Sequence, residues 1–213
     1  MKSRIEILVS LLPSVDSLAD VGCDHGQLTL LALENKKCKR AIISDVSEKC
    51  LLKAQTLLKN YVDLGVVKSI CTDGLKGIEK VDLVVIAGMG GEETVAILNN
   101  SNFLPTHLLL QPMKNPEKVR KTLLSLGYFI EKDFTFFIGE KYYDVIKATI
   151  GKDNLTLEEL EFGKTNVREK PVGFIKKLNA EKELLKGVLQ KSGVSESSMA
   201  EVLKRLEKIE KYV

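Results

Sequence analysis

One segment is the most informative about the fold of this chain: Ser17-Leu18-Ala19-Asp20-Val21-Gly22-Cys23-Asp24-His25-Gly26-Gln27-Leu28. An apolar strand ends at Asp20 and Val21, a turn with glycines at positions 22 and 26 follows, and a helix begins directly after it. A glycine-bearing turn of this kind lets a nucleotide-like ligand lie against bare backbone at a helix N-terminus. We expect a ligand-binding loop here, against the alternative of an ordinary strand–turn–helix connection.

The spacing of the glycines indicates which ligand the loop accepts. Dinucleotide binding calls for G-x-G-x-x-G, whereas three residues separate the two glycines of this loop. An acidic residue two positions before the first glycine, with polar residues between the glycines, suits S-adenosylmethionine, which has no pyrophosphate to neutralise. The cofactor-binding residues predicted in this loop are Asp20, Gly22, Asp24 and Gly26.

Composition is that of an ordinary globular protein. Of 213 residues, 44% are hydrophobic and 29% charged, and the net charge of +3 neither indicates nor excludes a nucleic-acid partner. No apolar run is long enough to cross a bilayer, so we expect a cytoplasmic protein without membrane contact. Four scattered cysteines and two histidines argue against a disulfide framework and a metal site.

Strands and helices alternate through the first 126 residues. Strands are predicted at 17–21, 40–45, 67–71, 81–87 and 107–110, and helices at 3–12, 28–35, 48–64, 91–99 and 116–126. Near-continuous apolar strands indicate a parallel sheet covered on both faces. Two longer runs, 128–138 and 142–150, would add an antiparallel hairpin. The predicted fold class is α/β, a Rossmann-like class I methyltransferase sheet followed by a C-terminal α-helical hairpin.

That helical hairpin is expected because composition changes after Gly151. Helices are predicted at 156–169, 172–191 and 195–212, and a break at Gly193 would fold the last two into a coiled-coil-like pair. We therefore divide the chain into a sheet domain, residues 1–151, and a helical domain, residues 152–213. Because 13 Lys and Arg stand against 11 Asp and Glu from residue 151 onward, composition does not show RNA binding.

Acidic residues follow the second and third predicted strands. Asp45 stands where an acid accepts hydrogen bonds from ribose hydroxyls in folds of this class, although it could equally cap the next helix. Asp73 and Gly74 follow the third strand. The Asp73 carboxylate could accept a hydrogen bond from the amine of an adenine ring, but Asp-Gly is also a common turn dipeptide.

The fourth and fifth strands end in residues suited to the reacting groups. In the run Gly88-Met89-Gly90-Gly91 we assign Gly88 to the cofactor and expect Met89, poorly packed between glycines, to contact cofactor or base. Gln111 offers a donor and an acceptor to a base edge. His25 either orders the first loop or lines the substrate pocket. Basic residues that could hold phosphates, or simply be solvated, are Lys114, Lys118, Arg120 and Lys121.

In this order the segments resemble the bacterial tRNA adenine-N1 methyltransferases that modify adenine 22. The matching motifs are 20–28, 73–75, 86–91, 109–112, 139–143 and 169–171, so the resemblance covers almost the whole chain. Residues 23, 26, 27 and 113 depart from the family pattern. The resemblance implies methylation of N1 of adenine 22 with S-adenosylmethionine as cofactor, tRNA as partner and no metal. We expect a monomer or weak dimer.

The resemblance also explains why no acid–base pair stands out. Adenine N1 has an available lone pair at neutral pH, so transfer depends on positioning and on excluding water. The residues assigned to catalysis are His25, Met89 and Gln111. One alternative is a methyltransferase for a small molecule or protein, with the helical hairpin used for oligomerisation. Another is a non-catalytic binding module, against which the intact cofactor loop argues.

Overall fold

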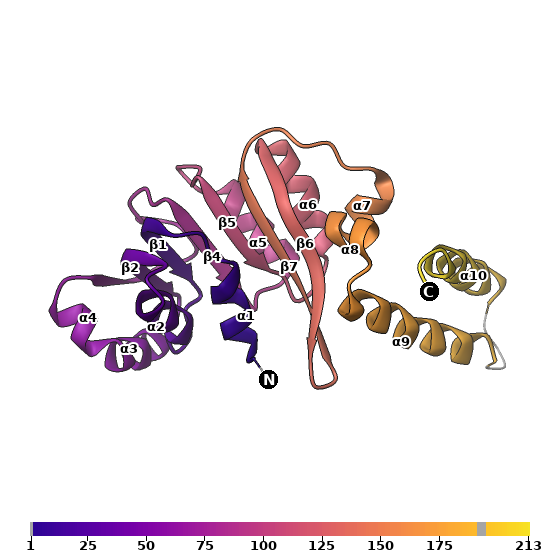
Figure 1. Ribbon diagram of the computed structural model, residues 1–213, viewed down its shortest axis with the longest axis horizontal. Helices are drawn as coiled ribbons and strands as arrows, with labels where there is room; N and C mark the ends of the chain where they lie inside the picture. Colours follow the sequence, from indigo (N-terminus) through magenta and orange to yellow (C-terminus); the bar gives the residue numbers. More distant parts are fainter. Residues whose placement is uncertain (1, 191–194) are drawn as a thin grey trace.

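The computed structural model describes residues 2–190 and 195–213, and its centre is one seven-stranded sheet (Figure 1). The strand order is β3-β2-β1-β4-β5-β7-β6, parallel from β3 to β5 and antiparallel at β7 and β6. The strands are β1 Val15–Val21, β2 Cys38–Asp45, β3 Val67–Cys71, β4 Leu83–Ala87, β5 His107–Gln111, β6 Tyr128–Ile138 and β7 Lys141–Ile150. The helices that flank the sheet are α1 Arg4–Leu11, α2 Gln27–Glu34, α3 Glu48–Leu57, α4 Lys59–Asp63, α5 Gly91–Asn99 and α6 Pro116–Ser125.

Helices cover both faces of the sheet because its central strands are apolar on both sides. Leu83 and Val85 of β4 belong to the apolar cluster under α1, α2 and α3, whereas Val84 and Ile86 belong to the cluster under α5 and α6. This alternation is the period-two pattern of a strand buried on both faces. The predicted α/β, Rossmann-like fold class is therefore confirmed (Figure 1).

The β6–β7 hairpin extends beyond the parallel part of the sheet. β6 and β7 contain 11 and 10 residues, whereas β5 contains 5. Leu110, one residue before the end of β5, pairs with Ile146, so residues 141–144 continue past the carboxyl end of β5. The hairpin tip thus overhangs the edge of the sheet at which ligands bind in this fold.

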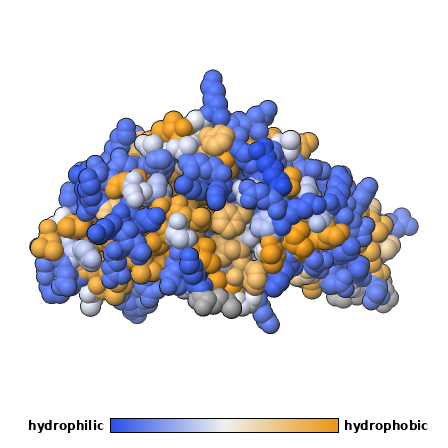
Figure 2. Space-filling view, in the orientation of Figure 1, coloured by the Kyte–Doolittle hydropathy of each residue, from blue (hydrophilic) through white to orange (hydrophobic). Residues whose placement is uncertain are grey.

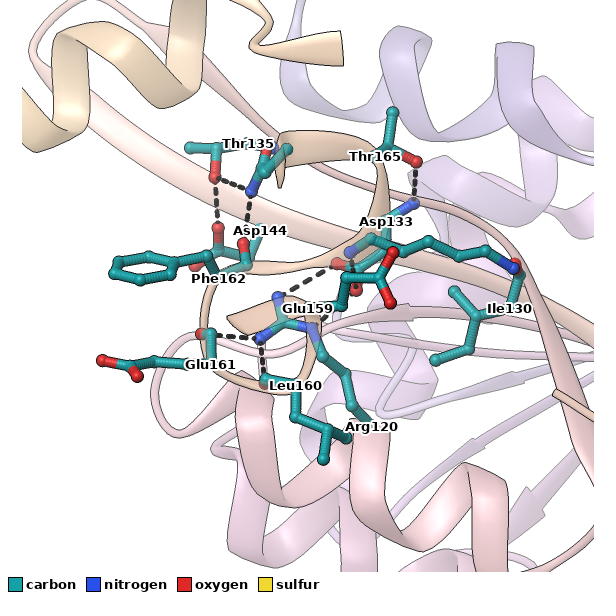
Figure 3. A network of polar contacts seen from close by, with 12 residues as sticks. Arg120, Ile130, Asp133, Thr135, Asp144, Glu159, Leu160, Glu161, Phe162 and Thr165 are labelled. Atoms are coloured by element: carbon teal, nitrogen blue, oxygen red, sulfur yellow. Dashed lines mark hydrogen bonds and ion pairs between the residues drawn. The ribbon is translucent and has the colours of Figure 1, made fainter. Parts of the chain in front are cut away.

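A buried arginine of α6, Arg120, connects the C-terminal segment to the sheet by pairing with β6 and also binding α7 (Figure 3). Arg120 Nε and Nη2 donate to the two oxygens of Asp133 at 2.6 and 3.0 Å, and both side chains are at most 1% exposed. Arg120 Nη1 donates to the carbonyls of Leu160 and Glu161, which belong to the last turn of α7 (Leu157–Phe162). These carbonyls have no partner within their helix, so Arg120 closes the end of α7.

Helix α8 (Lys164–Glu169) covers the open edge of β6. Thr165 Oγ1 accepts from the N–H of Asp133, and Asn166 Oδ1 accepts from the N–H of Thr135, both at 2.9 Å. Side chains thereby occupy ladder positions that another strand could otherwise pair with.

Helix α9 (Val172–Leu189) begins against β6 and extends away from the sheet, and α10 (Glu196–Glu210) packs against α9 (Figure 1). Their contact contains Phe174, Leu178 and Ile209. The predicted C-terminal helical pair is thus present, while its predicted break at Gly193 lies outside the described residues. The division of the chain at residue 151 stays a prediction.

Two predicted helices are each divided in two. The helix expected at 48–64 ends at Leu57 and resumes at Lys59, and the one expected at 156–169 is interrupted at Gly163. Gly163 has φ +102°, and a Cβ there would lie 2.9 Å from Asp133 Oδ1. Arg120 was predicted either to bind phosphate or to be solvated. Both predictions are wrong, because Asp133 and α7 bury its guanidinium.

Candidate active site

A pocket of about 470 Å³ lies at the carboxyl ends of β1, β2 and β4, with α1 beside it. It brings together most of the predicted site residues on one surface. Those that line it are Asp20, Gly22, Asp24, His25, Asp45, Gly88 and Met89. Side chains without a predicted role at the site complete the wall, among them Arg4, Leu8 and Leu28.

Asp20 is a buried carboxylate at the floor of this pocket. The Thr29 hydroxyl, from the first turn of α2, donates to Asp20 Oδ2 at 2.8 Å. Burial nevertheless raises the pKa of Asp20 from 3.8 to about 6, and the hydrogen bond from Thr29 opposes this shift. A ligand that carries positive charge would stabilise the ionised form.

Asp45 ties the glycine loop to the end of β2. Its Oδ2 accepts from the backbone N–H of Asp24 at 3.2 Å, and its Oδ1 accepts from the N–H of Ser47 at 2.9 Å. Ser47, whose hydroxyl accepts from the N–H of Cys50, is the N-cap of α3, so Asp45 is not. The ribose-binding role of Asp45 stays a prediction, and its place in the pocket wall is compatible with it.

Asp24 and His25 form the outer part of the loop. Asp24 adopts φ +49°, a left-handed conformation that Asp tolerates better than most residues. The half-exposed His25 ring places Nε2 3.4 Å from Asp24 Oδ1 and 3.2 Å from Lys53 Nζ. Both predicted roles of His25 remain open, because it contacts its own loop and also lines the pocket.

Gly22 is required by both conformation and space. Its φ is +69°, and a Cβ at this position would lie 2.0 Å from Met89 Cε. Met89 therefore packs directly over the glycine loop, and it also contacts the apolar cluster under α5 and α6. The expectation that Met89 is poorly packed between glycines is wrong, although its side chain does line the pocket.

The other predicted glycines serve packing in different ways. Gly26, at φ +74°, lies where a Cβ would approach Ala54 and Leu58 at 3.0 Å, and it does not line the pocket. Gly91 lies where a Cβ would be 2.5 Å from the carbonyl of Lys114. The glycine run after β4 thus partly serves contact with the loop after β5. Gly88 has φ +91°, and a Cβ at this position would lie 3.4 Å from Arg4 Nη1.

Gln111 lies behind the pocket wall and its amide is already engaged. The side chain is 1% exposed; Oε1 accepts from Arg4 Nη1 at 2.6 Å, and Nε2 donates to Met113 Sδ at 3.2 Å. The acceptor predicted to be available to a base is therefore used by Arg4. Sequence reasoning missed Arg4 because it stands alone in the first turn of α1, more than a hundred residues from Gln111.

Asp73 and Gly74 do not line this pocket. The exposed Asp73 carboxylate accepts from Lys76 Nζ at 2.8 Å, and Gly74 packs against Ile97. Their proposed contact with adenine stays a prediction.

The described parts of the chain, 2–190 and 195–213, contain no group of three or more His, Cys, Asp or Glu arranged to hold a metal ion. Within the same parts, no helix has both the length and the apolar character needed to span a membrane. Cys23 and Cys38 are buried, Cys50 is half-buried and Cys71 is exposed; all four are free.

The glycine loop after β1, the acid at the end of β2 and the pocket between them define a Rossmann-like protein with the architecture of a class I methyltransferase. Comparison with known proteins agrees. The sequence pattern of the methyltransferase domain family matches residues 1–146, and the chain belongs to that family.

Individual relatives are more specific. The chain is 26% identical to the Bacillus subtilis tRNA (adenine(22)-N(1))-methyltransferase over 192 residues, which cover 85% of this chain and 81% of that protein. It is 32% identical over 126 residues to a Mycoplasma pneumoniae protein with a provisional tRNA methyltransferase name, covering 58% of this chain but only 59% of that protein. The structure of M. capricolum TrmK with S-adenosylhomocysteine superposes with a TM-score of 0.88 at 25% identity, covering 100% and 97% of the two chains. The resemblance predicted from the sequence is confirmed.

Proposed function

We propose that this chain uses S-adenosylmethionine to methylate N1 of adenine 22 in tRNA. The observation that carries the proposal is the pocket at the carboxyl ends of β1, β2 and β4, lined by the carboxylates of Asp20, Asp24 and Asp45. The B. subtilis relative carries this activity in its name, and the M. capricolum relative holds the cofactor product. Both align with most of this chain, which supports the same substrate and cofactor here.

The acidic wall suits the charge that the reaction moves. In the transfer, adenine N1 forms a bond to the methyl carbon while the bond from that carbon to sulfur breaks. The positive charge leaves the sulfonium and appears on the methylated ring, so a cation is present throughout. Carboxylates around the pocket favour both cations. Because N1 carries a lone pair at neutral pH, no base is required, and the protein acts by positioning the two reactants.

The roles of individual residues are part of the proposal. The residues assigned to cofactor binding remain Asp20, Gly22, Asp24, Gly26, Asp45, Asp73, Gly74 and Gly88. Met89 and His25 face the pocket that holds the reacting groups, and Gln111 acts through Arg4. The sheet domain, 1–151, would hold the cofactor, while the helical domain, 152–213, grips the folded tRNA.

The target atom lies on the Watson–Crick edge of adenine, so a paired or stacked adenine must first be exposed.

Because the proposed substrate is tRNA, we expect a cytoplasmic enzyme. We propose a monomer or weak dimer, because the residues that line the pocket all come from one chain.

Methyl transfer from labelled S-adenosylmethionine to unmodified tRNA, followed by nucleoside analysis, tests the proposal. We expect label in 1-methyladenosine, and a loss of that label in Asp20→Asn. Label in another nucleoside would refute the target atom. Cofactor binding without any transfer to tRNA would instead favour a small molecule or protein as the acceptor.

A further inference from the structure

The β6–β7 hairpin forms a second wall beside the cofactor pocket. Tyr143 lies three residues beyond Ile146, the last β7 residue paired with β5, which places it about 10 Å past that pair at the rise of a strand. Its ring stacks on the ring of Phe136, the residue opposite it on β6, with centroids 5.4 Å apart and planes 25° apart. Both rings are on the face of the sheet that carries α1.

Arg4 connects this aromatic wall to the pocket. Its guanidinium carbon lies 6.0 Å from the centroid of the Tyr143 ring, while Nη1 donates to Gln111 Oε1. Arg4 itself lines the pocket, and Gly88 leaves the space beside Nη1 free of a side chain. Figure 2 shows apolar side chains gathered on this face between α1 and the start of α9, in a surface that is otherwise largely polar.

The hydrogen bond to Gln111 fixes one part of the guanidinium and leaves the rest available. A guanidinium only donates, so the Gln111 oxygen must face Arg4. One of the five N–H groups of Arg4 is used in this contact. The side chain is only half-buried, so further N–H groups can reach a ligand. The buried Gln111 amide therefore positions the Arg4 guanidinium at the edge of the pocket.

We propose that Arg4 and Tyr143 form the entrance that receives the target nucleotide: Arg4 binds a phosphate oxygen of the RNA backbone, and a base stacks on Tyr143. This inference rests on the proposed tRNA substrate. Arg4 is assigned to phosphate because a guanidinium fork matches phosphate geometry, whereas the methylated adenine is a cation that it would repel. Tyr143 is assigned to a base because unpaired RNA bases stack on aromatic side chains.

Equilibrium binding of unmodified tRNA to the full chain tests both assignments, with S-adenosylhomocysteine present and salt varied from 50 to 200 mM. Arg4→Met should reduce the slope of log Kd against log salt by about 0.7–0.9, the value of one lost phosphate contact. The matched control is Arg40→Met, which removes an exposed charge near the amino end of β2, and it should leave the slope unchanged.

Tyr143→Leu should weaken tRNA binding by roughly 5- to 150-fold, the range for one lost base–aromatic stack, without changing the salt slope. Tyr143→Phe should restore binding because it keeps the ring. The affinity of the two Tyr143 variants for S-adenosylhomocysteine should stay at the wild-type value, because Tyr143 does not line the cofactor pocket.

If Arg4 only holds Gln111 in place, Arg4→Met will show the same slope of log Kd against log salt as the wild type. That result would contradict the proposed phosphate contact. Equal tRNA affinity of Tyr143→Leu and wild type would overturn the stacking contact. These results are separate from the proposed function, because formation of 1-methyladenosine by the wild type is measured independently. A wild-type protein that binds tRNA without forming this product would contradict the proposed function. The binding data would still test whether Arg4 contacts a phosphate and Tyr143 stacks on a base.

Discussion

Asp20 should make cofactor binding depend on pH between pH 5 and 7. Its pKa in the free protein is raised to about 6 because the carboxyl is buried, despite the hydrogen bond from Thr29. S-adenosylmethionine brings an ammonium and a sulfonium into the pocket that Asp20 lines. Nearby positive charge favours the ionised carboxylate, so we expect the pKa of Asp20 to fall when the cofactor binds.

The size of the effect follows from proton linkage. If cofactor binding returns the pKa of Asp20 from about 6 to its ordinary value of 3.8, Kd should be roughly tenfold higher at pH 5 than at pH 7. The folding stability of the free protein depends on pH in the opposite direction to cofactor affinity. Its folded state holds this proton more tightly than its unfolded state, so Asp20 contributes roughly 3 kcal/mol of stability below pH 4 that is lost as pH rises through about 6.

Calorimetric titration of S-adenosylmethionine into the protein at several pH values measures this dependence. Asp20→Asn should make the cofactor Kd nearly independent of pH, because the amide cannot titrate. Asp63→Asn, which removes an exposed carboxylate on α4, is the matched control and should keep the pH dependence. A wild-type Kd that is constant from pH 5 to 7, or an Asp20→Asn variant with the full pH dependence, would show that Asp20 does not titrate on cofactor binding.

Three further predictions concern the loop, the ion pair and the C-terminal helices. Gly22→Ala should raise the cofactor Kd more than tenfold, since strain at φ > 0 costs about 1–2 kcal/mol and Met89 must also move; Met89→Ala in the same chain should recover part of the loss in the same titration. Arg120→Met leaves Asp133 buried without its partner and should lower the melting temperature by roughly 6–20 °C in a thermal scan, whereas replacing both residues by Leu should lower it less. Deleting residues 179–213, which keeps α7, α8 and the start of α9, should leave cofactor affinity unchanged and abolish tRNA methylation in the label assay; full activity would contradict a tRNA-gripping role for the deleted part.

The sheet could be predicted because its signals are local. Apolar runs of strand length, the glycine turn after Val21 and the proline that begins α6 each report on a few neighbouring residues. The long hairpin was visible in the same way, since 128–138 and 142–150 flank a short turn. These signals place the carboxyl ends of β1, β2 and β4 together, and most predicted site residues follow from that placement.

The breaks in two helices could not be predicted from periodicity. Apolar positions continue at helical spacing across Gly163, and only the approach of Asp133 and Arg120 explains why the chain turns there. The same holds for Arg120 itself. The sequence pattern indicates a solvated side chain for a basic residue in the second turn of a helix, whereas in the structure α7 packs over Arg120.

At the site, sequence reasoning identified positions better than it identified contacts. Gln111 does stand at the end of β5, but the partner that engages its amide comes from α1. Met89 does stand at the pocket, but its methyl group rests on Gly22 rather than in open space. In each case the missing information is a contact between distant parts of the chain.

Methylation of a single tRNA transcript in two versions, with adenine or guanine at position 22, shows whether the enzyme acts on adenine 22. We expect one equivalent of 1-methyladenosine in the adenine transcript and none in the guanine transcript, although both bind. Equal incorporation into the two transcripts, or none into either in the presence of bound cofactor, would contradict it.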